Sequence, residues 1–486
     1  MPLPDAARFF TDFRASLAGG DPLSVLRDGL IGKDALVDGP FGPQPMLYAD
    51  YVASGRALRQ VEMAVMDDVL PYYANSHTEA SFCGAYVTAL RRAARAEVAR
   101  LCGAGPDGAV IFGGSGATAG LNRLVHLFGL AEAVAEGRGA TVLHGPYEHH
   151  SNILPWRESG AEVIEIPEAA EGGPDLAALD AALARARRDH PDGLIVGTFS
   201  AASNVTGILT DVAEVTRRLK AAGALSVWDY AGGGPYLPMT LDPAPDAPAD
   251  ALVFSPHKFV GGPAASGVLI VRRSSVRALS PTFPGGGTVR YVSDRRHDYL
   301  ENVSDREEAG TPNVIGDIRA ALALIVKEVA GQARIEEIDR TLAARMIAHL
   351  AGVPRLRLLG KQSCHRLPIF SLVVEPGPDG AVHPQFATRL MSDLYGIQVR
   401  GGCACAGPYG HALLGIGTAQ SEALRDRIMA GDVVDKPGFL RFNLSYLTTE
   451  AEFRRIADAL SALPEAADRH RGRYCYEAGS GTFRAA

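Results

Sequence analysis

Lys258 is the residue whose surroundings most strongly indicate chemistry. It follows the apolar run Ala251–Phe254 and the polar Ser255-Pro-His257, and it precedes a second apolar run, Gly267–Val271. Apolar surroundings disfavour the charged ammonium and favour the neutral, nucleophilic amine that a Schiff base requires. An ordinary surface turn is the competing interpretation, and the other site residues in the chain argue against it.

A glycine-rich turn, Gly113-Gly-Ser-Gly-Ala-Thr-Ala-Gly-Leu-Asn122, follows another apolar run and opens a helical pattern. Backbone N–H groups around Gly116 can close on an anion at the positive end of that helix, and Ser115 and Thr118 add hydroxyl donors. The turn completes neither the dinucleotide-binding G-x-G-x-x-G nor the P-loop pattern. We therefore expect it to bind a phosphate group.

Two further strand ends carry polar side chains. Asp229 ends the run Leu225–Trp228, at the position where open α/β sheets bind ligands, and its carboxylate can pair with a heteroaromatic nitrogen or cap a turn. Either His149 or His150, which follow a different run, can lie flat on a ring. No third ligand at zinc-like spacing accompanies the two histidines, so we predict no metal site.

A Schiff-base lysine, a strand-end aspartate, a phosphate-binding turn and a ring-stacking histidine together predict a site for pyridoxal 5′-phosphate. This cofactor withdraws electrons from the α-carbon of a bound amino acid. The sequence therefore predicts an amino acid as the small-molecule substrate.

Short β-rich runs alternate with helical patterns between residues 46 and 311. Such alternation predicts an α/β fold with a mostly parallel sheet covered by helices on both faces. The seven runs are Ala109–Phe112, Ala140–Leu143, Glu162–Ile166, Gly193–Thr198, Leu225–Trp228, Ala251–Phe254 and Gly267–Val271.

Three regions are expected along the chain. Residues 1–45 are predicted to form an arm, with a helix over Ala6–Leu17, that packs with the small domain; residues 46–313 form the large domain. Residues 314–486 form a smaller α/β domain. Its predicted elements are a long helix from Val314 to Leu342 or beyond, a helix over 385–394, and strands over 368–374 and 440–445.

The composition limits the classes of partner and the cellular location that the sequence predicts. The chain has 486 residues with 48 basic and 55 acidic side chains, a net charge of -7, which supplies no electrostatic footprint for nucleic acid or an anionic membrane. The start of the chain lacks the pattern of a signal peptide, and we expect a cytoplasmic protein without membrane segments. Six cysteines in so long a chain do not form a disulfide framework.

The residues around Lys258 and the other site positions resemble the class V aminotransferase family, with the pyridoxal-phosphate fold type I. From Tyr48 to Ala457 the chain is similar to the branch that contains cysteine desulfurases and selenocysteine lyases. This resemblance implies that Lys258 forms the Schiff base and that Asp229 pairs with the ring nitrogen. It also assigns His149 to ring stacking. Ser255, His257, Ser115, Gly116, Thr118 and Asn204 are the other implied cofactor contacts.

The resemblance extends to the substrate and to a second subunit. Arg441, in Leu-Arg-Phe-Asn-Leu, matches the arginine that binds the substrate carboxylate, a bidentate task suited to guanidinium. Asn204, His77 and Arg400 complete the expected substrate contacts. The segment Glu308-Ala-Gly-Thr311-Pro-Asn resembles one that reaches the partner's phosphate, which implies a homodimer with shared active sites.

The stretch Val399-Arg-Gly-Gly-Cys-Ala-Cys-Ala-Gly-Pro-Tyr-Gly-His411 resembles the desulfurase loop that carries the sulfur-accepting cysteine. In that register Cys405 is the catalytic thiol and Cys403 replaces a histidine. A thiolate at Cys405 is required, and Arg400 or a histidine of the ring site is expected to favour it. Two cysteines in a core or a metal site, or a loop that only shapes the substrate pocket, are the alternatives.

Several positions depart from the family pattern. Gly232 and Gly233 stand where a glutamine is common, Ala117 and Ala119 replace polar residues of the phosphate turn, and Thr78 stands where arginine is frequent. The segment 412–438, which separates the cysteine loop from Arg441, is longer than expected. These departures predict a non-standard substrate pocket.

The predicted function is cleavage of a carbon-sulfur or carbon-selenium bond in cysteine or a related amino acid. The expected products are alanine and a persulfide on Cys405, with a sulfur-acceptor protein as a candidate partner. One alternative is an aminotransferase, epimerase or carbon-sulfur β-lyase that does not use Cys405. Another is a non-catalytic binding or metal-handling protein on the same fold.

Overall fold

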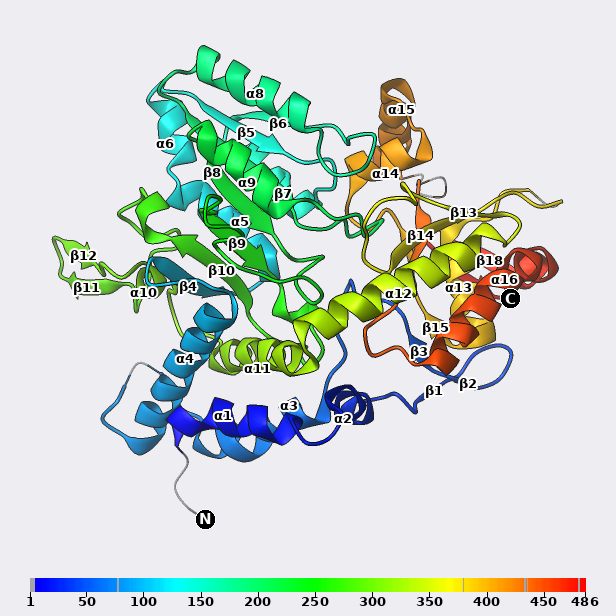
Figure 1. The fold of residues 1–486 in the computed structure, drawn as a ribbon, viewed down its shortest axis with the longest axis horizontal. Coiled ribbons are helices and arrows are strands. Elements are labelled where there is room, and N and C mark those ends of the chain that lie inside the picture. The colour runs from blue at the N-terminus through cyan, green and yellow to red at the C-terminus, as the bar shows by residue number, and fades with distance from the viewer. Residues whose placement is uncertain (1–4, 77, 379, 432–433, 435, 480) are drawn as a thin grey trace. The chain divides into compact units, whose positions relative to one another are not determined.

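The chain forms two structural units in the computed structural model, and Figure 1 labels the elements of both. Unit 1 comprises Met1–Ile31, Ser54–Ala201 and Thr210–Arg334, and unit 2 comprises Gly32–Ala53, Ala202–Leu209 and Ile335–Ala486. The structure describes residues 5–76, 78–378, 380–431, 434, 436–479 and 481–486. In these ranges no helix combines the length and the apolar character needed to cross a membrane.

A seven-stranded sheet organises unit 1. Its strand order is β4-β10-β9-β8-β7-β5-β6, and only β10 runs antiparallel to its neighbours. All seven strands coincide with the runs predicted from the sequence. Six of them are short, almost continuously buried stretches, whereas β6, at the edge of the sheet, is only partly buried. The strands are β4 Gly108–Gly113, β5 Ala140–His144, β6 Glu162–Glu165, β7 Leu194–Ser200, β8 Leu225–Asp229, β9 Ala251–Phe254 and β10 Gly267–Arg272.

Helices cover both faces of this sheet. On one face, alternate strand residues such as Val142, Val196 and Val253 share a buried cluster with the α5 residue Leu121. On the other face, the backbone of Gly197 lies against Leu219 of α9. Because neighbouring strand residues point to opposite faces, Val196 and Gly197 place α5 and α9 on opposite sides.

The helices of unit 1 range from one turn to five turns. They are α1 Ala6–Leu17, α2 Pro22–Gly29, α3 Arg59–Ala64, α4 Phe82–Leu101, α5 Gly116–Leu127, α6 Leu130–Ala135, α7 Leu154–Glu158, α8 Leu176–Asp189, α9 Val212–Ala221, α10 Val303–Glu307 and α11 Val314–Ala330. Two short strands, β11 Val289–Val292 and β12 His297–Tyr299, form an antiparallel hairpin.

The first helix, α1, has the predicted bounds, but it packs within unit 1 against α4 and α11. Its apolar stripe, which includes Phe10 and Phe13, is buried. Arg14 on its flank pairs with Glu97 at 2.7 Å and with Glu328 at 2.8 Å. The packing of residues 1–45 therefore differs from the prediction, since residues up to Ile31 belong to unit 1 and only Gly32–Ala53 belong to unit 2.

The predicted long helix from Val314 is two helices, α11 and α12 Gln332–Ala351. They are separated at Gly331, whose φ of 86° lies in the left-handed region that terminates helices. Unit 1 ends at Arg334, so α11 belongs to the large unit rather than to the predicted small domain. The prediction of one continuous helix was wrong because apolar periodicity persists on both sides of this glycine.

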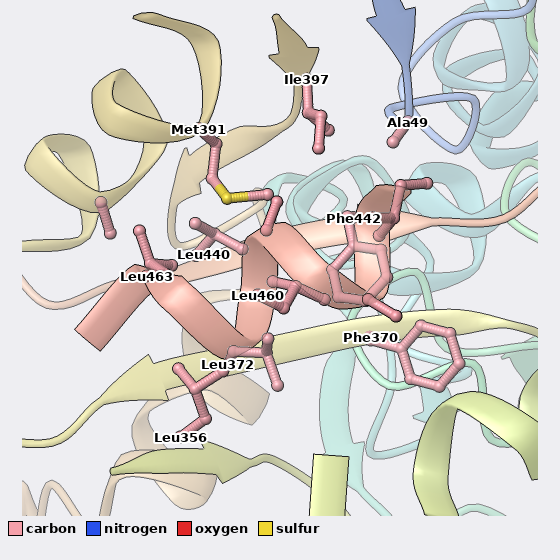
Figure 2. Packing of buried hydrophobic residues seen from close by; sticks show 14 of the residues in the cluster. Ala49, Leu356, Phe370, Leu372, Met391, Ile397, Leu440, Phe442, Leu460 and Leu463 are labelled. Carbon is pink, nitrogen blue, oxygen red and sulfur yellow. The ribbon is translucent and has the colours of Figure 1, made fainter. Parts of the chain in front are cut away.

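Unit 2 is built on a four-stranded antiparallel sheet with the order β13-β14-β17-β16. Its strands are β13 Leu356–Leu358, β14 Ile369–Val374, β16 Arg400–Gly402 and β17 Phe439–Asn443. Phe370 and Phe442 face each other across β14 and β17, and Leu460 of α16 packs with them in the same buried cluster (Figure 2).

Unit 2 has five α-helices in its described part: α12, α13 Pro384–Tyr395, α14 Gly407–Leu414, α15 Thr418–Met429 and α16 Glu450–His470. Of these, α12, α13 and α16 pack on this sheet through shared buried residues. Three small two-stranded pairings complete the unit: β1 Leu36–Val37 with β2 Gln44–Pro45, β3 Leu47–Tyr48 with β15 Ile397–Gln398, and β18 Tyr474–Glu477 with β19 Thr482–Ala485.

Candidate active site

The glycine-rich turn joins the end of β4 to the start of α5. Gly116 adopts a φ of 61°, and a Cβ at this position would lie 2.6 Å from Ser255 Oγ. The N–H of Ala117 donates a hydrogen bond to Ser255 Oγ over 2.9 Å. Ser115 is exposed and Thr118 is half-buried at the same helix start. The turn thus brings backbone and hydroxyl groups together at the positive end of α5.

Lys258 ends a single 3₁₀ turn, η4 Pro256–Lys258, directly after β9. The carbonyl of His257 accepts hydrogen bonds from the N–H of Gly55 at 2.8 Å and from the Ser54 hydroxyl at 3.3 Å. Burial lowers the pKa of His257, and the charge of Lys258 lowers it further. Lys258 itself is half-buried. The backbone directly before the lysine is therefore held by Ser54 and Gly55.

Asp229 ends β8, the strand next to β9, and is almost completely buried. Its pKa is raised chiefly by burial, while the N–H of Ala231, at 2.7 Å, and the charge of Lys258 act in the opposite direction. A buried carboxylate with one backbone donor and a nearby cation is suited to hold a further proton donor such as a ring N–H.

His149 is half-buried and lies after β5, where its Nδ1 is 3.0 Å from Ser151 Oγ. Ser151 Oγ in turn lies 2.7 Å from Thr118 Oγ1, so a hydroxyl chain connects His149 to the start of α5. His150 also lies here, and its ring centroid is 6.1 Å from that of His149. The sequence analysis did not indicate Ser151, although it directly follows the two histidines.

Glu148 is a second residue that the sequence did not single out. It is fully buried and accepts hydrogen bonds from the Ser200 N–H at 2.8 Å, from the Ser200 hydroxyl at 2.7 Å and from Asn152 Nδ2 at 2.5 Å. Burial raises the pKa of Glu148 to about 7, and the charge of Asp229 adds to this rise. Glu148 therefore fixes the segment that carries His149 to the end of β7.

The segment predicted to reach a second subunit begins at a buried ion cluster. Glu308 accepts the N–H of Phe112 at 2.6 Å and pairs with Arg95 at 2.8 Å and with Arg91. Burial opposes ionisation of Glu308, but the arginines and the N–H of Phe112 hold its pKa below the usual value. Thr311, three residues further, is exposed. His77, a predicted substrate contact, lies outside the described residues.

These residues of unit 1 fit pyridoxal phosphate. Lys258 follows β9, Asp229 ends β8, and α5 begins after β4. These three strands are parallel to one another, so their carboxyl ends lie at the same edge of the sheet. Ser255 Oγ leaves no room for a side chain at Gly116 in the glycine-rich turn. Lys258, Asp229, His149, Ser255 and the start of α5 would hold the cofactor.

Arg441 lies on β17 in unit 2, directly opposite Arg400 on β16. Asp50 separates their charges: its Oδ1 is 3.0 Å from Arg441 Nη2, and its Oδ2 is 3.0 Å from Arg400 Nε. Arg441 Nη1 also donates to the Asn204 carbonyl at 3.2 Å. The sequence indicated the two arginines but not Asp50, which is 391 residues away from Arg441 in the chain.

Two polar atoms of this cluster are buried without a hydrogen-bond partner in the described part of the chain. They are Arg441 Nε and Asn204 Oδ1. Burial lowers the pKa of Arg441, Asp50 opposes this change, Arg400 adds to it, and Cys405 also opposes it. A buried guanidinium with a free N–H is suited to bind a carboxylate, because each unpaired polar atom is costly.

The cysteine loop follows β16. Cys405 is exposed, Cys403 is half-buried, and both are free thiols. Ala404 and Cys405 adopt φ values of 51° and 54°, which costs about 1–2 kcal/mol for each non-glycine residue. Asn204 Nδ2 donates to the Ala404 carbonyl at 2.9 Å. Because the Asn204 carbonyl accepts from Arg441, Asn204 contacts both the strained turn and the arginine. The described residues contain no group of three potential metal ligands.

Comparisons with known proteins agree over most of the chain. The family described as "Aminotransferase class-V" matches residues 47–455. A cysteine desulfurase of Pectobacterium carotovorum subsp. carotovorum (strain PC1) is 30% identical over 401 residues, which cover 80% of this chain and 92% of that protein. A probable cysteine desulfurase of Vibrio cholerae serotype O1 is 32% identical over 372 residues, or 75% of this chain and 85% of that protein.

Solved structures show the same fold. The apo structure of a cysteine desulfurase from Thermococcus onnurineus NA1 matches with a TM-score of 0.73 and 23% identity, covering 91% of this chain and 98% of that one. The cysteine desulfurase CsdA from Escherichia coli matches with a TM-score of 0.71 and 24% identity over the same shares. The predicted α/β architecture with a seven-stranded, mostly parallel sheet is thereby confirmed.

Proposed function

Because the chain belongs to the class V aminotransferase family, in its cysteine desulfurase branch, we propose that it is a pyridoxal-phosphate enzyme that removes sulfur from cysteine or a related amino acid. The products are alanine and a persulfide on Cys405. Support comes from curated relatives that carry the name cysteine desulfurase at about 30% identity over most of their length. The start of α5, Asp229 and Lys258 supply the contacts that the cofactor needs.

The observation that carries the proposal is that Asn204 joins the cysteine loop to Arg441 within unit 2. Asn204 Nδ2 donates to the carbonyl of Ala404, the residue before the exposed Cys405, at 2.9 Å, and the Asn204 carbonyl accepts from Arg441 Nη1 at 3.2 Å. In the proposed reaction, Arg441 binds the carboxylate of the substrate while the Cys405 thiolate attacks its sulfur. The thiolate, rather than the thiol, is the nucleophile in such an attack.

The residues of unit 1 would divide the remaining tasks. Pyridoxal phosphate supplies, when bound, an electron-withdrawing ring that weakens bonds at the substrate's α-carbon. The Lys258 amine accepts the α-proton and returns it to the product. The Asp229 carboxylate holds a proton at the ring nitrogen, and His149 covers one face of the ring. Ser255 and Thr118 contact the phosphate.

The family resemblance also supports a homodimer. Glu308 is fixed to β4 through the N–H of Phe112, and Thr311 follows it on an exposed segment. We propose that this segment contacts the phosphate bound by a second copy of the chain. Mixing Lys258→Ala with Thr311→Ala subunits tests this, because shared sites let a mixed dimer recover activity at one of its two sites.

The reaction is tested by incubating the purified yellow holoprotein with L-cysteine and dithiothreitol and measuring alanine and sulfide. We expect equal amounts of both from the wild type. Cys405→Ala should lose both products while keeping the cofactor absorbance, and Lys258→Ala should lose that absorbance. Cys475→Ala, which removes an exposed thiol from the hairpin strand β18, is the matched control and should behave as the wild type.

Other outcomes would identify a different reaction. Sulfide from Cys405→Ala at the wild-type rate would mean a β-lyase. Reaction of the bound cofactor with other amino acids, without alanine from cysteine, would mean an aminotransferase or epimerase. A protein that stays colourless when pyridoxal phosphate is added would refute the catalytic proposal.

A further inference from the structure

The two cysteines of the loop occupy a tight reverse turn. The N–H of Ala406 donates to the Cys403 carbonyl over 3.2 Å, and the two residues between them, Ala404 and Cys405, both have φ near 50°. A four-residue turn with positive φ at both central positions is a type I′ turn. Cys403 is its first residue and Cys405 its third.

This turn holds the Cα atoms of the two cysteines at a separation that a disulfide can span. Two Cα atoms on either side of one left-handed residue lie roughly 5.5 Å apart. Disulfides join Cα atoms about 4.4–6.8 Å apart, so the spacing permits a bond between Cys403 and Cys405 without unfolding the loop. A bond across so small and strained a loop is easily reduced, as is typical of catalytic rather than structural disulfides.

The surroundings of the turn keep the two cysteines together. Asn204 Nδ2 holds the carbonyl of Ala404, the residue between them, at 2.9 Å. Cys405 is exposed while Cys403 is half-buried, so an external thiol reaches Cys405 more readily than Cys403. A thiol two residues away has an effective concentration that dilute external thiols do not match.

We propose that Cys403 is the resolving thiol for the persulfide on Cys405, an inference that rests on the proposed desulfurase function. The Cys403 thiolate attacks Sγ of Cys405. The bond from that Sγ to the terminal sulfur breaks, and the terminal sulfur leaves with the bonding electrons as hydrosulfide. The Cys403 sulfur is oxidised, the terminal sulfur is reduced, and a Cys403–Cys405 disulfide remains. An external dithiol then reduces this disulfide and becomes a disulfide itself.

A consequence is that sulfide release does not require an acceptor at the first turnover. The reduced holoenzyme, freed of reductant and given one equivalent of L-cysteine, should release about one sulfide per alanine. Its mass should fall by about 2 Da, and non-reducing peptide mapping should locate the bond between Cys403 and Cys405. In Cys403→Ser the ratio of sulfide to alanine should fall at least tenfold, and Cys405 should gain about 32 Da until dithiothreitol is added.

A second measurement does not depend on turnover. Diamide, a thiol oxidant, should link Cys403 to Cys405 in the wild-type holoenzyme, and Cys475→Ser should form the same bond. Failure to form it would refute the proposal, as would an unchanged ratio of sulfide to alanine in Cys403→Ser. If the wild type forms no alanine, the proposed function itself fails, and the resolving step fails with it.

Discussion

Replacing Asp50 by asparagine should destabilise unit 2 strongly, because it removes the negative charge between two arginines. The Arg441 side chain is only 4% exposed and that of Asp50 only 10%, and their closest atoms are 3.0 Å apart. Breaking a buried ion pair by removing one partner typically costs about 3–5 kcal/mol. The asparagine oxygen can still accept from Arg441, so we expect the lower end, about 3 kcal/mol.

The other arginine increases this effect. Arg400 lies opposite Arg441 on the neighbouring strand, where like charges repel, although Arg400 is half-exposed and can regain water. A loss of about 3 kcal/mol in a unit of this size corresponds to a fall in the melting temperature of about 6–12 °C. Scanning calorimetry of the cofactor-free protein measures it without a contribution from bound cofactor.

A surface ion pair in the same unit is the matched control. Arg357 and Glu375 lie 2.7 Å apart with side chains 49% and 40% exposed, so Glu375→Gln should cost less than about 1 kcal/mol. The double variant Asp50→Asn/Arg441→Met should recover at least half of the lost stability, because no buried charge then remains unpaired. Equal melting temperatures for Asp50→Asn and Glu375→Gln would refute the buried-pair argument.

Three further predictions concern the site. Glu148→Gln should be more stable than the wild type at pH 8 but not at pH 5. Burial raises the pKa of Glu148 in the folded state to about 7, so the wild type loses roughly 3 kcal/mol of stability as the pH rises from the pKa of glutamate in the unfolded chain through 7. Urea titrations across this pH range would detect or disprove the loss. Gly116→Ala should weaken cofactor binding and lower the stability by about 1–2 kcal/mol, because Gly116 has a φ of 61° and an added Cβ would meet Ser255. Gly114 has open space around it, so Gly114→Ala should change neither cofactor binding nor stability. Similar cofactor titrations for the two variants would contradict this prediction. Arg441→Lys should raise KM for the amino acid at least tenfold with a smaller change in kcat, because lysine cannot donate two parallel hydrogen bonds to a carboxylate. An unchanged KM in steady-state kinetics would exclude Arg441 from carboxylate binding.

Much of the fold could be predicted because its signals are local. Runs such as Ala140–His144 and Ala251–Phe254 are buried along their whole length, and a strand covered on both faces is apolar at most of its positions. The predictions failed where one residue interrupted a persistent pattern. Gly331 ends α11, yet the apolar periodicity of α11 and α12 continues on both sides of it.

The N-terminal segment shows a different reason for failure. The amphipathic pattern of α1 predicts a helix with one buried face, and the structure has that helix. The pattern does not identify the surface that packs against this buried face of α1. That choice depended on α4 and α11, whose Glu97 and Glu328 pair with Arg14 across long sequence separations.

The sequence by itself determined the candidate chemistry: Lys258 after an apolar strand, Asp229 at another strand end, the glycine-rich turn, and two cysteines separated by one residue. Each of these is a property of a short segment, which the chain carries wherever that segment lies. The tertiary structure alone decided the partners of these groups. Asp50 pairs with Arg441, Ser255 accepts from Ala117, and Asn204 donates to Ala404, because folding brings together residues that are 138 to 391 positions apart. Burial then affects the ionisation of these groups, because the charged form of a carboxylate or guanidinium removed from water is stabilised only by the few groups that remain in contact with it.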